Sequence, residues 1–111
     1  MIYENLRPIG KDELLKAMPA GGERAAVALV RMALFEEDQP WAEQQCLAAL
    51  ASTDAQVRLA AVTCSGHLAR LHRSIDLKIV AALEALRVDG LVRGMVDDAL
   101  EDVRIFTAEQ A

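Results

Sequence analysis

Asp54-Ala55-Gln56-Val57-Arg58 recurs thirty-five residues later as Asp89-Gly90-Leu91-Val92-Arg93, with the aspartate, the valine and the arginine in the same places. Each copy follows a segment rich in alanine and leucine with the apolar spacing of an amphipathic helix. A repeat of about 35 to 47 residues with two helices per unit is typical of α-solenoids, in which helix pairs stack because one pair cannot bury its apolar face alone. The repeat predicts an all-α solenoid, and we expect its function to lie on a surface.

The composition also favours helices. Hydrophobic residues make up 53% of the 111 residues and aromatic residues only 4%, so the core must be built mainly from alanine, leucine and valine, which let helices pack closely. A chain of this length is the size of one domain and can bury a core without disulfides or a metal ion. We expect a single domain over residues 1–111, with residues 1–10 as an N-terminal arm.

Apolar periodicity and capping residues predict six helices. They are expected at about residues 11–18, 22–37, 40–51, 55–72, 75–87 and 89–106. Asp54 and Asp89 are expected to cap the fourth and the last helix, and Ser74 or Asp76 the fifth. The segment 22–37 is almost wholly apolar, so we expect it to be the central helix. Short connections make successive helices antiparallel neighbours, which gives three hairpins at about 11–37, 40–72 and 75–106.

Charge and targeting signals limit the compartment and the partner. Seventeen acidic and twelve basic residues give a net charge of −5, which argues against a phosphate backbone as the main partner. Acidic residues predominate toward both ends of the chain and basic residues in its middle. The N-terminus lacks the pattern of a signal peptide, and the longest apolar run is too short to span a bilayer. We expect a cytoplasmic protein that is not bound to a membrane, with Cys46 and Cys64 reduced inside helices.

A metal site is not expected. Cys64 and His67 are three residues apart and therefore share a helix face, which Cys46 could approach from the preceding helix. However, the chain has no Cys-x-x-Cys or His-x-x-x-His pair and no evident fourth ligand, and cysteines inside helices usually behave as small buried hydrophobes. His67 is expected to be either a hydrogen-bonded structural residue or a contact for a partner.

Catalysis is not expected either. Asp97, Asp98, Glu101 and Asp102 have a spacing that also occurs on catalytic carboxylate helices, but catalysis would need facing ligands from another helix. The neighbouring helix is expected to supply Thr63, His67 and Arg70 instead, and the chain has no glycine-rich phosphate loop. We expect no enzyme, no cofactor and no small-molecule substrate, and the acidic cluster is either a solvated face or a patch that binds a protein.

A family resemblance adds a function. The segments Cys46–Leu50, Asp54–His72 and Asp98–Phe106, with the motif Asp54-x-x-Val57-Arg58 followed by Ala61, Gly66 and Leu68, resemble small bacterial HEAT-like proteins. The resemblance covers roughly residues 41–106. Compact proteins of this kind serve as immunity proteins of contact-dependent growth inhibition and related polymorphic toxin systems, in which each neutralises a cognate toxin, usually a nuclease. The resemblance therefore implies a HEAT-like superhelix that inhibits a toxin.

The repeat register predicts the binding surface. Second helices of stacked pairs form one wall, which is the usual binding surface of solenoids. Thr63, His67 and Arg70 share one stripe of this wall, and adding thirty-five residues gives Asp98, Asp102 and Ile105; Arg24, Arg31 and Glu36 are their approximate equivalents in the first pair. An acidic wall can cover the basic groove of a nuclease and associate with it quickly through electrostatic steering. The candidate contacts are Glu37, Asp38, Trp41, His67, Arg70, Asp97, Asp98, Glu101 and Asp102.

The sequence is also compatible with other roles for Trp41 and for the scaffold as a whole. Trp41 either staples its helix to the preceding turn or anchors a partner, because tryptophan is common at interface hot spots. The same scaffold could serve as an adaptor that binds a peptide or protein of another kind. A HEAT-like module that binds nucleic acid is the third possibility, and it would have to use the basic residues Arg58, Arg70, Arg73, Lys78 and Arg87.

Overall fold

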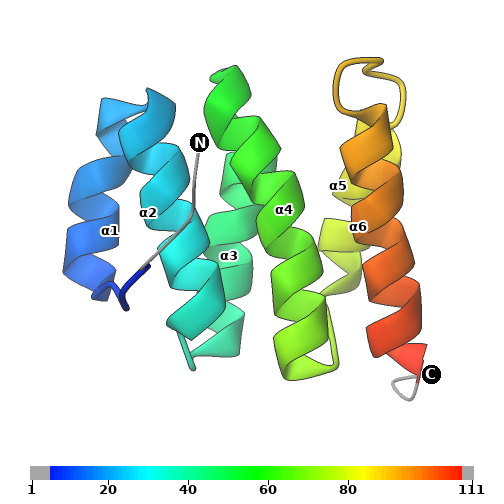
Figure 1. The fold of residues 1–111 in the computed structure, drawn as a ribbon, viewed down its shortest axis with the longest axis horizontal. Helices are drawn as coiled ribbons and strands as arrows, with labels where there is room; N and C mark the ends of the chain where they lie inside the picture. The colour runs from blue at the N-terminus through cyan, green and yellow to red at the C-terminus, as the bar shows by residue number, and fades with distance from the viewer. Residues whose placement is uncertain (1–5, 109–111) are drawn as a thin grey trace.

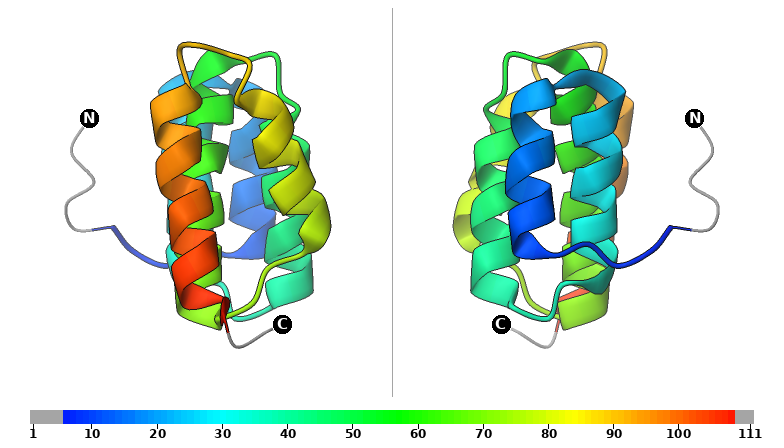
Figure 2. Two further views of the ribbon diagram at one scale, coloured as in Figure 1. Left: turned by 90° about the vertical axis from the view of Figure 1, so that its right-hand side faces the viewer. Right: turned by 90° about the vertical axis from the view of Figure 1, so that its left-hand side faces the viewer.

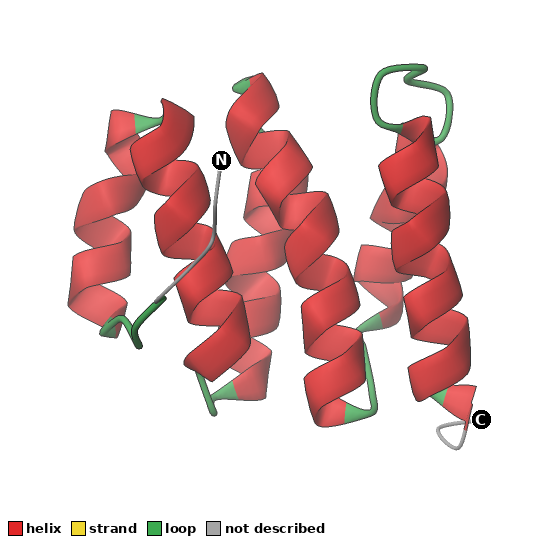
Figure 3. Cartoon of the chain, in the orientation of Figure 1, coloured by secondary structure: helices red, strands yellow, loops and turns green. Residues whose placement is uncertain are grey.

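The structure is a computed structural model that describes residues 6–108, and these residues form helices and turns but no strand (Figures 1 and 3). The elements are α1 (Lys11–Ala17), a short 3-10 helix η1 (Met18–Ala20), α2 (Gly22–Phe35), α3 (Gln39–Leu50), α4 (Ala55–His72), α5 (Leu77–Leu86) and α6 (Arg93–Phe106). The all-α prediction is confirmed. Of the expected N-terminal arm, residues 6–10 precede α1 without helix, and residues 1–5 lie outside the described part of the chain.

The helices form two layers. α2, α4 and α6 lie side by side in one layer, with α1, α3 and α5 in the other, and the connections alternate between the two ends of the molecule (Figures 1 and 2). The central helix is α4, which packs against α2, α3 and α6. The expectation that the helix beginning at Gly22 would be central is therefore wrong. α2 is apolar because α1, η1, α3 and α4 all pack on it, at one end of the layer.

Aspartates fix the start of three helices. The carboxylate of Asp38 accepts a hydrogen bond from Trp41 N at the start of α3, and that of Asp76 accepts one from Lys78 N at the start of α5. Asp54 accepts from Gln56 N (2.9 Å) and Val57 N (3.3 Å) at the start of α4. These bonds satisfy amides that have no partner within their own helix.

The second copy of the repeat motif differs at this point. Asp89 does not cap α6; its carboxylate accepts from Leu91 N (3.0 Å) inside a turn, and the helix begins only at Arg93. Gly90 stands where the first copy has Ala55, and glycine costs about 1 kcal/mol relative to alanine inside a helix. The first turn of the expected helix is therefore a hydrogen-bonded turn, in which the carbonyl oxygen of Asp89 accepts from Val92 N (3.1 Å) and Arg93 N (3.0 Å).

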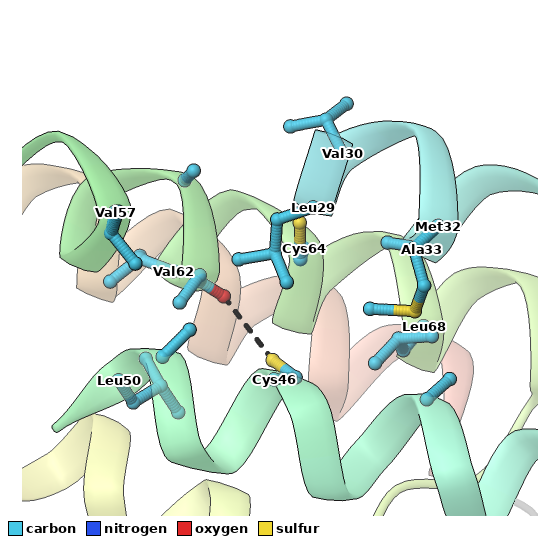
Figure 4. Close-up of a cluster of buried hydrophobic side chains, with 14 of the residues drawn as sticks. Leu29, Val30, Met32, Ala33, Cys46, Leu50, Val57, Val62, Cys64 and Leu68 are labelled. Carbon is cyan, nitrogen blue, oxygen red and sulfur yellow. Dashed lines mark hydrogen bonds between the residues drawn. The ribbon is translucent and has the colours of Figure 1, made fainter. Parts of the chain in front are cut away.

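The core is built from small and medium apolar residues, as the composition predicts. The largest fully buried side chains are Leu14, Leu29, Met32, Leu68, Ile79 and Leu83. Cys46 and Cys64 are buried and free, and they pack among leucines and valines (Figure 4). Burial raises the pKa of the Cys46 thiol to about 11 and raises that of Cys64 as well. Both thiols are therefore protonated, inert parts of the core.

Candidate functional site

A groove lies between α4 and α6, with a volume of about 160 Å³. It is lined by Val62, Thr63, Gly66 and His67 of α4 and by Met95, Asp98, Ala99 and Asp102 of α6. We call it the α4/α6 groove. The thirty-five-residue register placed Thr63 and His67 beside Asp98 and Asp102, and the structure brings these four residues together.

Gly66 sets the closeness of the two helices. A Cβ atom at this position would lie 3.0 Å from the Oδ2 atom of Asp102 and 3.8 Å from the Cα atom of Ala99. A side chain here would therefore press on Asp102 and narrow the groove. The sequence signal for this contact is Gly66 itself, because a glycine in the middle of a helix often has a packing reason.

His67 is neutral in this setting. Burial is the main cause that lowers its pKa, and the neighbouring Arg70 lowers it further, while Asp102 acts in the opposite direction. The Nη2 atom of Arg70 lies 2.6 Å from Nδ1 of His67. Because a guanidinium can only donate, Nδ1 accepts and the imidazole proton resides on Nε2. A neutral His67 adds no positive charge to the groove, so it does not compensate the negative charges of Asp98 and Asp102.

The acidic cluster of α6 divides between two faces. Asp97 pairs with Arg87 (2.9 Å), and Glu101 pairs with Arg104 (2.5 Å), outside the α4/α6 groove. Asp98 and Asp102 line the groove instead. Within residues 6–108 neither of these two carboxylates takes part in an ion pair or a side-chain hydrogen bond. The expected single acidic patch is thus divided into a paired couple, Asp97 and Glu101, and an unpaired couple, Asp98 and Asp102.

The paired couple belongs to an end face formed by α5 and α6. A surface pocket of about 420 Å³ on this face is lined by Val80, Glu84, Arg87, Asp97, Leu100, Glu101, Val103 and Arg104. Thirty-five residues before Asp97, Glu101 and Arg104 stand Val62, Gly66 and Ala69, which are buried. The helix face that is buried in α4 is therefore charged in α6. The acidic and basic side chains on this face of α6 largely neutralise each other through their ion pairs.

The expected contacts near α3 lie elsewhere. Asp38 accepts a hydrogen bond from Lys11 Nζ (2.5 Å), which lowers the pKa of the aspartate and raises that of the lysine. The same Nζ atom lies 5.1 Å from the centre of the Trp41 ring, and Trp41 is half-buried against the core. These contacts tie α1 to α3 and favour the interpretation of Trp41 as a staple. Glu37 is exposed in the turn before α3, and none of these residues lines the α4/α6 groove.

The first helix pair contributes no side chain to the groove either. Arg31 donates to the carbonyl oxygens of Arg7 (2.9 Å) and Pro8 (3.0 Å) and lies 3.4 Å from Glu13. It therefore holds the segment before α1 across α2, at the end of the molecule away from α6 (Figure 2). Arg24 and Arg31 line a separate pocket of about 440 Å³ between α1 and α2. The expectation that these arginines extend the same wall is wrong, because α2 turns its polar side toward α1.

Among residues 6–108 no group of three histidine, cysteine, aspartate or glutamate side chains could hold a metal ion. None of the helices in that range is long and apolar enough to cross a membrane. Comparison with known proteins found no matching family model, no matching curated protein and no matching solved structure.

Proposed function

We propose that the chain is a short HEAT-like α-solenoid of three antiparallel helix pairs, in which α2, α4 and α6 form the binding wall. Residues thirty-five positions apart are buried in α4 and just before or within α6, which supports the repeat. These pairs are Val57 and Val92, Ala61 and Val96, and Leu68 and Val103. Contacts between neighbouring units also support it, because Arg58 of one copy of the motif lies 3.8 Å from Asp89 of the next.

The charged end face fits this proposal. In repeat proteins the outermost unit exposes a polar face where an inner unit would bury an apolar one. Asp97, Glu101 and Arg104 replace buried small or apolar residues in this way. Because the charged side chains of the end face are already paired with each other, they are poor contacts for a partner. The wall with its groove is the better candidate for binding.

The function we propose is that of an immunity protein, which binds a cognate bacterial toxin, a nuclease, and neutralises it. The observation that carries this proposal is the pair of carboxylates at Asp98 and Asp102, which residues 6–108 leave unpaired beside a groove. A nuclease must have a basic surface for its phosphate substrate, and an acidic inhibitor with a net charge of −5 is steered toward it. The positive charge of Arg70 and the neutral imidazole of His67 beside the aspartates would give the contact a pattern of charged and polar groups and hence its specificity.

The test is co-expression with the product of the gene directly upstream, because an immunity gene directly follows that of its toxin. We expect the protein to prevent growth arrest by that product, to form a stable complex with it, and to give no protection from an unrelated nuclease toxin. A complex without protection would favour the adaptor function instead. Absence of both complex and protection would refute the proposed function.

A further inference from the structure

We propose that the α4/α6 groove is the receptor for a single arginine side chain of the protein partner. This inference rests on the proposed function in one respect only, namely that the partner is a protein with a basic surface. It adds the chemical group that the partner must present and the residues that receive it.

The size of the groove indicates one side chain. Its volume is about 160 Å³, whereas pockets for small molecules and cofactors measure about 300 to 1,000 Å³. A volume of this size suits one long side chain better than a nucleotide or a drug-sized ligand.

The lining of the groove matches an amphipathic cation. Met95 is 38% exposed and, beside Ala99 and Gly66 at the floor of the groove, offers an apolar side chain on which the methylene groups of a long side chain can pack. Asp98 and Asp102 are four residues apart on α6, so their carboxylates lie on one side of the helix, one turn from each other. A phosphate or another anion would be repelled by this pair.

Arginine fits this arrangement better than lysine. The guanidinium is planar and has five donors, so it can bond two carboxylates at once, whereas the lysine ammonium is a compact charge that is more strongly hydrated. No cation of the described residues fills this place already. The nearest arginine on α4, Arg70, donates to His67 instead. Asp102 is half-buried, and a carboxylate removed from part of its water gains most from a paired cation.

The inference can be tested on the protein alone. The isotope-labelled chain is titrated with Nα-acetyl-arginine amide while backbone amide signals are followed by NMR, with Nα-acetyl-citrulline amide as the uncharged analogue of the same shape. We expect saturable shifts for Gly66, Met95 and Ala99 at millimolar arginine derivative, weaker shifts with Nα-acetyl-lysine amide, and none with the citrulline derivative.

Two double variants locate the binding. Asp98→Asn with Asp102→Asn should abolish the shifts, whereas Asp97→Asn with Glu101→Asn, the matched control on the same helix, should retain them. Gly66→Ala should weaken them, because its Cβ would press on Asp102. Absence of saturable shifts, equal shifts with citrulline, or shifts that persist without Asp98 and Asp102 would overturn the inference. Protection from the toxin is measured separately, so its loss or retention judges the proposed function and not the arginine receptor.

Discussion

Asp54 joins two helices through one carboxylate. Its Oδ1 atom caps α4, and its Oδ2 atom accepts a hydrogen bond from Gly22 N (2.7 Å) at the start of α2. Asp54→Ala should leave amides of both helices without a partner, and we expect a melting temperature lower by roughly 5 to 15 °C. Asp76→Ala is the control, because that side chain caps α5 alone. Equal losses in the two variants, measured by circular dichroism, would contradict the double cap.

The same residue predicts a dependence on pH. Hydrogen bonds from the amides of Gly22, Val57 and Gln56 hold the pKa of the Asp54 carboxyl below its ordinary value, and Arg58 contributes. A lowered pKa stabilises the fold above the pKa of the unfolded chain, about 4, and this stabilisation disappears as the pH falls through the folded pKa. The difference in melting temperature between the protein and Asp54→Ala should therefore shrink from about pH 5 to about pH 3. A difference that stays constant over this range would show that the charge of Asp54 is unimportant.

Gly21 has a backbone that other residues rarely adopt, with φ 62° and ψ −165°. A Cβ atom there would also lie 2.7 Å from Asp54 Oδ2, which accepts a hydrogen bond from Gly22 N, while Oδ1 of the same carboxylate is held by Gln56 N and Val57 N. Gly21→Ala should destabilise the protein by about 1 to 3 kcal/mol, measured by urea denaturation. Gly10→Ala is the control, because a Cβ at Gly10 meets nothing within 4 Å and its φ is −77°. An unchanged midpoint for Gly21→Ala would mean that this turn adapts without strain.

At the scale of the helices, the two copies of the repeat arginine differ. Arg58 donates to the carbonyl of Ser52 (3.0 Å) and approaches Asp89, and its side chain is 23% exposed. The side chain of Arg93 is 63% exposed, and among the described residues its one ion pair is with Asp97 at 4.0 Å. Arg58→Ala should therefore cost about 1 to 3 kcal/mol, and Arg93→Ala less than about 1 kcal/mol. Chemical denaturation of both variants checks this, and equal effects would show that Arg58 is an ordinary surface charge.

The difference between the two repeat arginines follows from their neighbours. The partner of Arg58 comes from the next copy of the motif, and no described element packs over Arg93 in the same way. Helix positions were predictable because apolar spacing and capping aspartates are local signals. The central place of α4 was not predictable. The apolarity of a helix such as α2 indicates how completely it is covered, but it does not indicate which elements cover it. The late start of α6 was also missed, because the capping pattern predicts Asp89 as a cap and does not reveal that its carboxylate bonds Leu91 N within a turn.

At the scale of the molecule, half of the groove could be read from the sequence. The repeat register brings Thr63 and His67 to Asp98 and Asp102, since equivalent helices lie side by side. The pairing of Glu101 with Arg104 was also readable, because residues three apart on a helix are neighbours. The pairing of Asp97 with Arg87 depends on how α5 lies against α6, which no local pattern reveals. For that reason the sequence could not separate free carboxylates from paired ones.

The central claim is that the wall binds its partner with Asp98 and Asp102. The most direct measurement is the affinity of the purified protein for the product of the upstream gene, compared between two double charge reversals on α6. Asp98→Lys with Asp102→Lys should weaken binding by about 2 kcal/mol or more, roughly thirtyfold in Kd. Asp97→Lys with Glu101→Lys, which changes the net charge equally, should have a clearly smaller effect. Equal weakening by both pairs, or none by the first, would contradict the claim.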